Sequence, residues 1–256
     1  MQILILVLVS FGASCLSFYS GFGLGTLLLP VFALWFPIDQ AVLMTAMVHF
    51  ANNIFKYALT RKNLNPVILL RFGIPAIVGS ITGALILNFL NEVTSDYALN
   101  VFGSIRMVHP MKMLIGMLII VFGIMEFIEF GSKRWSLKSM TVGGFLSGFF
   151  GGLSGHQGAL RSAFLLRYEL SKEVFIATGI AIACLVDISR ILVYMPQILT
   201  GKISSNTGLI LFAILAAFGG AWLGNRYLKK INIKWIKIIT AIGVILIGIA
   251  LAIGLI

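Results

Sequence analysis

The sequence predicts an all-α polytopic membrane protein made of two inverted repeats, each with four segments, of which the first is a glycine-broken hairpin. Composition excludes a soluble domain, because 59% of the 256 residues are hydrophobic and 11% are charged, too few to cover its surface. Several apolar stretches reach the length of a membrane-spanning helix, which favours helices over a β-barrel. Polar positions also recur between the two halves of the chain in one register.

Ten apolar segments follow one another along the chain, separated by short polar or basic connections. A helix needs about 20 residues to cross the hydrocarbon core of a bilayer, and two of these segments are too short to do so. The two short segments each follow a glycine- and serine-rich break, at 20–25 and at 153–158. We expect each to form a hairpin with the segment before it, because free backbone groups at a break need a cavity rather than lipid. The segments are 2–19, 24–36, 38–58, 66–90, 111–130, 139–153, 158–170, 172–195, 207–228 and 234–255, and the short ones are 24–36 and 158–170.

An internal repeat relates the two halves. A shift of 134 residues superimposes the two breaks and three further polar positions, and later shifts of 141 and 125 residues superimpose glycines and lysines. Such a register inside apolar sequence predicts a duplicated unit, which is common in transporters. The predicted divisions are a first membrane repeat at 1–130, a basic linker at 131–138 and a second membrane repeat at 139–256. The matched residues are Ser20 and Gly21 with Ser154 and Gly155, Asp39 with Glu173, Asn53 with Asp187, Lys56 with Arg190, Gly79 and Gly83 with Gly220 and Gly224, Lys112 with Lys237, and Gly123 with Gly248.

The distribution of lysine and arginine predicts the topology. If each broken segment crosses the membrane once, loops on the two sides carry 10 and 9 basic residues; if each is a hairpin that returns to its own side, they carry 15 and 4. Basic loops concentrate on the cytoplasmic side, so the second arrangement is favoured. It places both termini outside the inner or plasma membrane, and the loops at 59–65, 131–138 and 226–236 in the cytoplasm. The net charge of +11 is a topology signal of this kind and not a nucleic-acid site.

The two breaks form the candidate substrate-binding site. Close packing by small residues is the alternative explanation for their glycines, as it is for Gly79-x-x-x-Gly83 and Gly220-x-x-x-Gly224. In the functional interpretation, each break exposes the N-terminus of a short helix, whose free N–H groups and positive dipole end attract an anion. The candidate substrate-binding residues are Ser20, Gly21, Gly23, Gly25, Ser154, Gly155, His156, Gln157, Gly158 and Arg161.

The breaks and the segments after them resemble a known family. The break closed by Pro30, the helix PIDQAVLMTAMVHFANNIFKY, the basic TRKNLN loop and the stretch GGLSGHQGALRSAFLL are similar to the TauE/SafE sulfite exporter family. The resemblance covers nearly the whole chain and is most specific at about 20–60 and 148–190. It implies a small membrane permease for sulfite, sulfonates or related sulfur-containing anions. The polar second break, with His156, Gln157 and Arg161, departs from the glycine-rich pattern frequent in the family.

Arg161 is the most informative single residue, because it lies one turn into the second short segment with no acidic residue within four positions. An arginine at bilayer depth costs about 2.5–3.5 kcal/mol. Its side chain could extend to the cytoplasmic surface or bind a backbone carbonyl. Alternatively, its guanidinium binds an oxyanion through paired hydrogen bonds, with Gln157 and the hydroxyls of Ser20 and Ser154 as further donors.

Further polar residues in the apolar segments are candidates for gating or ion coupling. Asp187 and Arg190 lie three residues apart on one helix face and are expected to form an ion pair, and their first-half counterparts indicate a role common to both halves. His49 and His156 are each either structural, hydrogen-bonded residues or groups that titrate near neutral pH and couple transport to protons. The candidate gating or coupling residues are His49, Asn53, Lys56, Asp187 and Arg190.

No enzymatic, cofactor or metal chemistry is indicated. The chain has no HExxH, no CxxC, no Walker motif and no GxSxG at a strand–helix turn, and Cys15 and Cys184 lie in apolar runs as small buried residues. We therefore expect a secondary transporter that carries a small anion by alternating access around a midplane site between two hairpin tips. A proton, another ion or the membrane potential is expected to drive it. A passive anion channel is the nearest alternative, and a non-transporting membrane enzyme or scaffold is a further one.

Overall fold

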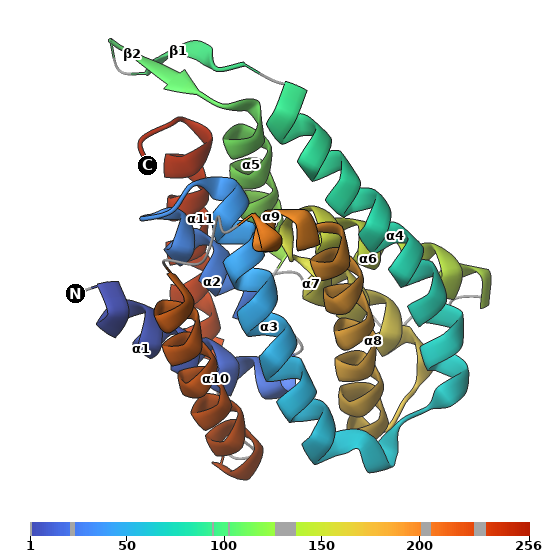
Figure 1. Cartoon of the computed structure of the whole chain (residues 1–256). Helices are drawn as coiled ribbons and strands as arrows, with labels where there is room; N and C mark the ends of the chain where they lie inside the picture. Colours follow the sequence, from blue (N-terminus) through green and yellow to red (C-terminus); the bar gives the residue numbers. More distant parts are fainter. Residues whose placement is uncertain are drawn as a thin grey trace.

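The computed structural model describes residues 2–20, 24–93, 95–101, 103–125, 137–200, 206–227 and 234–256, which form a bundle of α-helices with a small β-hairpin at one end (Figure 1). The predicted helical membrane class is confirmed. The first half supplies α1 (Gln2–Ser20), α2 (Leu24–Ala33), α3 (Ile38–Thr60), α4 (Pro66–Val93) and α5 (Pro110–Met125). The second half supplies α6 (Leu137–Ser154), α7 (Gln157–Leu165), α8 (Lys172–Val193), α9 (Met195–Leu199), α10 (Thr207–Tyr227) and α11 (Lys234–Ala252).

The second glycine-rich break interrupts a helix where the sequence predicts it. α6 ends at Ser154 and α7 begins at Gln157, and between them Gly155 has a φ of +82°, a conformation that favours glycine. The first break separates α1 from α2, and its residues 21–23 lie outside the described residues. α2 and α7 are 10 and 9 residues long, too short to cross a bilayer, and each packs against the helix before it.

Side chains at the helix starts explain where the long helices begin. Pro66 occupies the first position of α4, and the Oδ1 atom of Asn65 accepts a hydrogen bond from the backbone N–H of Ile68 at 3.1 Å. At the start of α8, the hydroxyl of Ser171 accepts from the backbone N–H of Val174 at 3.3 Å. These side-chain contacts mark where α4 and α8 begin.

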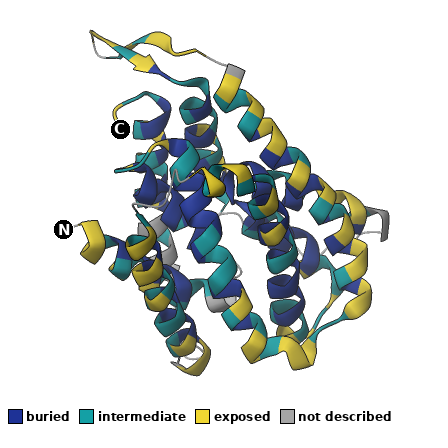
Figure 2. Cartoon of the chain, viewed as in Figure 1, coloured by how far each residue is buried: buried dark blue, intermediate teal, exposed yellow. Residues whose placement is uncertain are grey.

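Three of the described helices are long and apolar enough to cross a membrane by length and composition: α4 over Pro66–Glu92, α8 over Lys172–Val193 and α10 over Thr207–Arg226. α3 has a comparable length of 23 residues but carries buried polar side chains. Large apolar side chains are exposed along α4 and α10, and Figure 2 shows yellow outer faces around a dark blue centre. These outer faces are suited to contact with lipid tails.

A two-stranded antiparallel hairpin connects α4 to α5, which the sequence analysis did not predict. β1 (Tyr97–Val101) pairs with β2 (Ser104–Val108), and Gly103 between them has a φ of +80°. Strand-favouring residues such as Tyr97, Val101 and Ile105 occur in this connection, and a tight glycine turn lets them pair. Arg106 donates from Nη1 to the backbone oxygen of Gly254 at 3.2 Å, which attaches the hairpin to the end of the chain.

The helix contacts of the two halves mirror each other. α4 lies along α6 of the other half, and its counterpart α10 lies along α1. α3 packs on its counterpart α8, and α5 packs on α11. Figure 1 shows α3 and α8 side by side and running in opposite directions. Antiparallel counterparts are expected from an axis in the membrane plane, so this packing supports the predicted inverted repeat, while the division at 131–138 stays a prediction.

Glycines allow the close approach of helices from opposite halves. A Cβ added to Gly79 or Gly83 would overlap backbone atoms of α6 at Phe145 and Phe149. In the mirrored interface, a Cβ on Gly220 would overlap the backbone oxygen of Phe11 in α1. The interpretation of these glycines as packing residues is therefore confirmed for both described interfaces.

Three basic residues that entered the loop count are buried inside the bundle. Lys56, Arg161 and Arg190 have exposed fractions of 3%, 7% and 0%. Side chains in the protein interior carry no topology signal, so the count becomes 13 on one side and 3 on the other. The bias keeps its direction, and the external position of both termini stays a prediction.

Candidate functional site

A small cavity lies where the two breaks meet α3 and α8. Its volume is about 40 Å³. The first turn of α2, the start of α7 and one face each of α3 and α8 form its walls, so both halves of the chain contribute. The lining residues are Ser17, Leu24, Gly25, Thr26, His49, Asn53, Lys56, Gly155, Gly158, Arg161, Ser162, Phe175, Ile176, Gly179 and Ile180.

The two breaks touch each other at this cavity. A Cβ built on Gly25 would lie 2.9 Å from the backbone oxygen of Gly155, so a side chain at Gly25 would push the breaks apart. Leu24 and Gly25 begin α2, and Gly158 lies in the first turn of α7. The N-terminal turns of both short helices, with backbone N–H groups that lack helical acceptors, therefore face one volume.

Two buried cations line the cavity from opposite halves. Arg161 on α7 donates from Nη1 to the Oε1 atom of Gln157 at 3.2 Å, and Gly179 on α8 leaves room for the guanidinium, since a Cβ there would lie 3.4 Å from its Nε. Lys56 on α3 donates from Nζ to the hydroxyl of Ser17 at 2.7 Å. Arginine and lysine in a confined, buried environment create a strong positive potential, which attracts anions.

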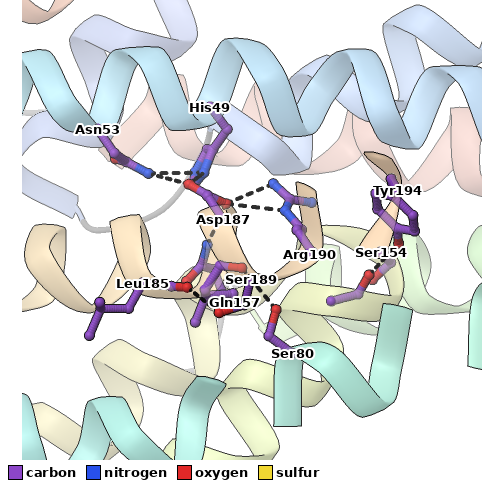
Figure 3. Close-up of polar contacts among 12 residues, drawn as sticks. His49, Asn53, Ser80, Ser154, Gln157, Leu185, Asp187, Ser189, Arg190 and Tyr194 are labelled. Atoms are coloured by element: carbon purple, nitrogen blue, oxygen red, sulfur yellow. Dashed lines mark hydrogen bonds and ion pairs between the residues drawn. The ribbon is translucent and has the colours of Figure 1, made fainter. Parts of the chain in front are cut away.

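Asp187 on α8 joins three helices through its carboxylate (Figure 3). Arg190 donates to Oδ1 from Nε at 3.2 Å and from Nη2 at 2.8 Å, which is the ion pair predicted from their spacing. Gln157 donates from Nε2 to the same oxygen at 3.0 Å. Asn53 donates from Nδ2 to Oδ2 at 2.9 Å, and the Nδ1 atom of His49 lies 2.7 Å from Oδ2. The carboxylate therefore connects α3 and α7 to α8.

The amide of Gln157 relays this network to the cavity. Its Nε2 atom donates to Asp187 while its Oε1 atom accepts from Arg161, so one side chain fixes the position of the guanidinium relative to the carboxylate. The hydroxyl of Ser147 donates to the backbone oxygen of Gln157 at 3.0 Å and holds the start of α7 on α6. The arrangement holds the guanidinium of Arg161 at the cavity wall through the same side chain that binds Asp187.

The comparison with protein families matches Sulfite exporter TauE/SafE over residues 6–251 of the 256-residue chain. The chain belongs to the TauE/SafE sulfite exporter family. The match covers both short helices, α2 and α7, and every residue that lines the cavity, and it confirms the resemblance seen in the sequence. The family consists of membrane transporters of sulfite and related sulfur anions rather than enzymes. Comparisons with curated proteins and with solved structures each gave no match.

Within this exporter-family fold, three predicted binding residues lie behind the cavity wall instead of on it. The hydroxyl of Ser154 donates to the backbone oxygen of Phe150 at 3.1 Å and lies 3.0 Å from the Nδ1 atom of His156. The ring of His156 is buried and stacks on Phe122 with a centroid distance of 5.2 Å. Gln157 is committed to Asp187 and Arg161. The hydroxyl of Ser154 and the amide of Gln157 have partners in the protein, whereas the Nε2 atom of His156 is buried without a hydrogen-bond partner among the described residues. None of the three lines the cavity, so their direct contact with the substrate stays a prediction.

Other predicted residues of the exporter family site divide between the cavity and the undescribed break. Gly25, Gly155, Gly158 and Arg161 line the cavity. Gly21 and Gly23 lie outside the described residues, and the side chain of Ser20 is likewise not described. The first break therefore reaches the site through the start of α2.

Sequence reasoning assigned Lys56 to gating and missed its place on the cavity wall beside His49 and Asn53. The three residues are spaced by four and then three positions, which puts them on one face of a helix. That spacing is the signal that could have identified a polar wall. The contact between His49 and Asp187 joins two halves of the chain, and only the packing of α3 on α8 reveals it.

Proposed function

We propose that this protein is a secondary transporter that carries a small inorganic sulfur oxyanion, sulfite or an ion of similar size, by alternating access. The observation that carries the proposal is the small cavity between the two broken helices, with Arg161 and Lys56 in its wall. Family membership supports a sulfur anion as the cargo. The cavity supports an anion site shared by both halves.

Charge supports an anionic cargo. Among the buried side chains that the structure describes, Lys56, Arg161 and Arg190 are cations, and Asp187 is a carboxylate. Burial of cations away from water is costly unless negative charge or hydrogen-bond acceptors compensate it. An oxyanion in the cavity would supply acceptors to the guanidinium in paired geometry and to the ammonium as a point charge. The N-terminal turn of α2 would add backbone donors.

Size favours an inorganic ion over an organosulfonate. One water needs about 10–15 Å³ of cavity volume, so a cavity of about 40 Å³ holds three or four water-sized groups. Sulfite has four non-hydrogen atoms and fits this volume, whereas a sulfonate with a carbon chain needs more space. The walls near Phe175 and Ile176 are apolar and offer no partner for a second polar end.

Counterflow in proteoliposomes tests the proposal. Purified protein is reconstituted at equal density, vesicles are loaded with unlabelled sulfite, and labelled sulfite is added outside. A carrier accumulates label transiently against its gradient, whereas a passive channel cannot. Arg161→Lys keeps the charge but loses the paired hydrogen bonds, so sulfite affinity should fall by about 1–3 kcal/mol. Arg161→Ala should abolish counterflow.

Leu160→Ala is the matched control, because this neighbouring residue does not line the cavity and should leave counterflow unchanged. If the Arg161→Ala protein exchanged sulfite at the wild-type rate, Arg161 would not hold the anion. If the wild-type protein passed sulfite without any transient accumulation, the passive channel would replace the carrier as the explanation.

A further inference from the structure

We infer that His49 is the proton-binding group of the transport cycle, so that a proton and the oxyanion bind together in the cavity. This inference rests on the proposed anion transport and adds the coupled ion and the atom that carries it. It starts from the position of one side chain. Of the residues that line the cavity, His49 is the histidine, and its side chain is 12% exposed.

The carboxylate of Asp187 determines which ring nitrogen carries the permanent hydrogen. Asp187 accepts hydrogen bonds from Arg190, Gln157 and Asn53, so it acts as an ionised acceptor. At 2.7 Å from an ionised carboxylate oxygen, the Nδ1 atom of His49 donates to it. The Nδ2 atom of Asn53 also lies 3.0 Å from Nδ1, and its hydrogen goes to Oδ2 of Asp187 instead. The other ring nitrogen, Nε2, is then the one that gains and loses a proton.

The exchangeable edge of the ring faces the first break. Nε2 is bonded to Cδ2, and Cδ2 is the ring atom of His49 nearest to Gly25, since a Cβ built on that glycine would lie 3.7 Å from it. Gly25 is in the first turn of α2 and in the cavity wall. Because His49 lines the cavity, protonation at Nε2 adds a positive charge and an N–H donor to the cavity wall.

The charges that act on His49 come from two neighbouring helices. α8 presents Asp187 and Arg190, α7 presents Arg161, and α3 itself carries Lys56 in the same wall. α2 has no charged residue, and the basic residue of α10, Arg226, is exposed in its last turn.

Thermodynamic linkage then joins the proton to the anion. With the cavity empty, a protonated ring adds one more positive charge next to buried cations. An oxyanion in the cavity places negative charge there and favours the protonated ring, and a protonated ring favours the anion by the same free energy. The two ligands should therefore bind with positive cooperativity and move in the same direction.

Sulfite affinity of wild-type and His49→Gln proteins, measured by calorimetry in detergent between about pH 6 and about pH 8, tests this inference. Sulfite itself takes up protons in this range, but that effect is common to both proteins and cancels in the ratio of their dissociation constants. The ratio should be near one at the alkaline end. It should rise as the pH falls, by up to about tenfold per pH unit, because only the wild-type ring becomes protonated.

His109→Gln is the matched control, because His109 lies at the start of α5 and outside this cavity. The ratio of its sulfite dissociation constant to that of the wild-type protein should not change with pH. A constant ratio for His49→Gln would overturn the inference while leaving anion transport intact. Absence of sulfite binding by the wild-type protein at every pH would instead overturn the proposed function. If His49→Gln fails to fold, a measurement on the wild-type protein tests the inference instead. The number of protons taken up when sulfite binds is determined by calorimetry in buffers of different ionisation heat. If the protein takes up no more protons than the protonation of sulfite itself explains, the inference is overturned.

Discussion

Separate removal of the two members of the Asp187–Arg190 pair should destabilise the protein unequally. Both side chains are fully buried, and they are joined by two hydrogen bonds of 3.2 and 2.8 Å. Asp187→Asn removes the negative charge and leaves a buried guanidinium without its counter-ion. A buried pair broken in this way typically loses about 3–5 kcal/mol of unfolding free energy.

Arg190→Met should cost less, because the carboxylate keeps three other partners, His49, Asn53 and Gln157. We expect about 1–3 kcal/mol for the loss of the charge-assisted bonds. The double variant removes both charges, so its cost should fall below the sum of the single costs by at least about 2 kcal/mol.

Unfolding free energies in mixed detergent micelles, measured by circular dichroism as the SDS fraction rises, give all three values. Thr82→Val is the control, because its hydroxyl contacts the backbone of its own helix on an exposed face, and it should change stability by less than about 0.5 kcal/mol. Strictly additive costs in the double variant, or a larger cost for Arg190→Met than for Asp187→Asn, would refute the reasoning.

Two further predictions concern packing and orientation. Gly148→Ala should destabilise the protein by about 1–3 kcal/mol, because the added Cβ overlaps the backbone oxygen of Ala76. The control Gly243→Ala has open space around the added Cβ and should be neutral or stabilising. Equal melting temperatures of the two variants would contradict this prediction. In a cysteine-free background, a cysteine placed at Asn63 should react with a membrane-impermeant thiol reagent only after the cells are permeabilised. A cysteine placed at Met107 should react in intact cells. The opposite pattern would exclude the predicted orientation.

Composition and apolar spacing predicted the helices and both breaks, because these depend on local sequence. The repeat register matched Asn53 with Asp187, and these two side chains are hydrogen-bonded across the halves. Local sequence could not predict which polar groups face the cavity, since that depends on how each helix is rotated in the packed bundle. Gln157 lies behind the wall and Lys56 lies on it for this reason.

The packing also changes which parts can move against each other. In the simplest form of alternating access between two repeats, the two halves rock against each other as units. In the structure, α4 packs on α6 and α8 of the other half, and one apolar cluster joins these helices with α7. α10 likewise packs on α1 and α3. A rocking motion that keeps these interfaces intact would therefore move groups of helices drawn from both halves.

The glycine interface between α4 and α6 has a consequence for how the protein is made. α4 is synthesised before α6, yet its Gly79 and Gly83 can be covered only by the backbone at Phe145 and Phe149, more than 60 residues later in the chain. Until then, this surface of α4 faces lipid or a membrane chaperone. The first half is therefore not expected to fold stably by itself. A ribosome that stalls in the connection between the halves would leave α4 without its partner helix. Such truncated chains should be degraded rather than accumulate as stable half-molecules.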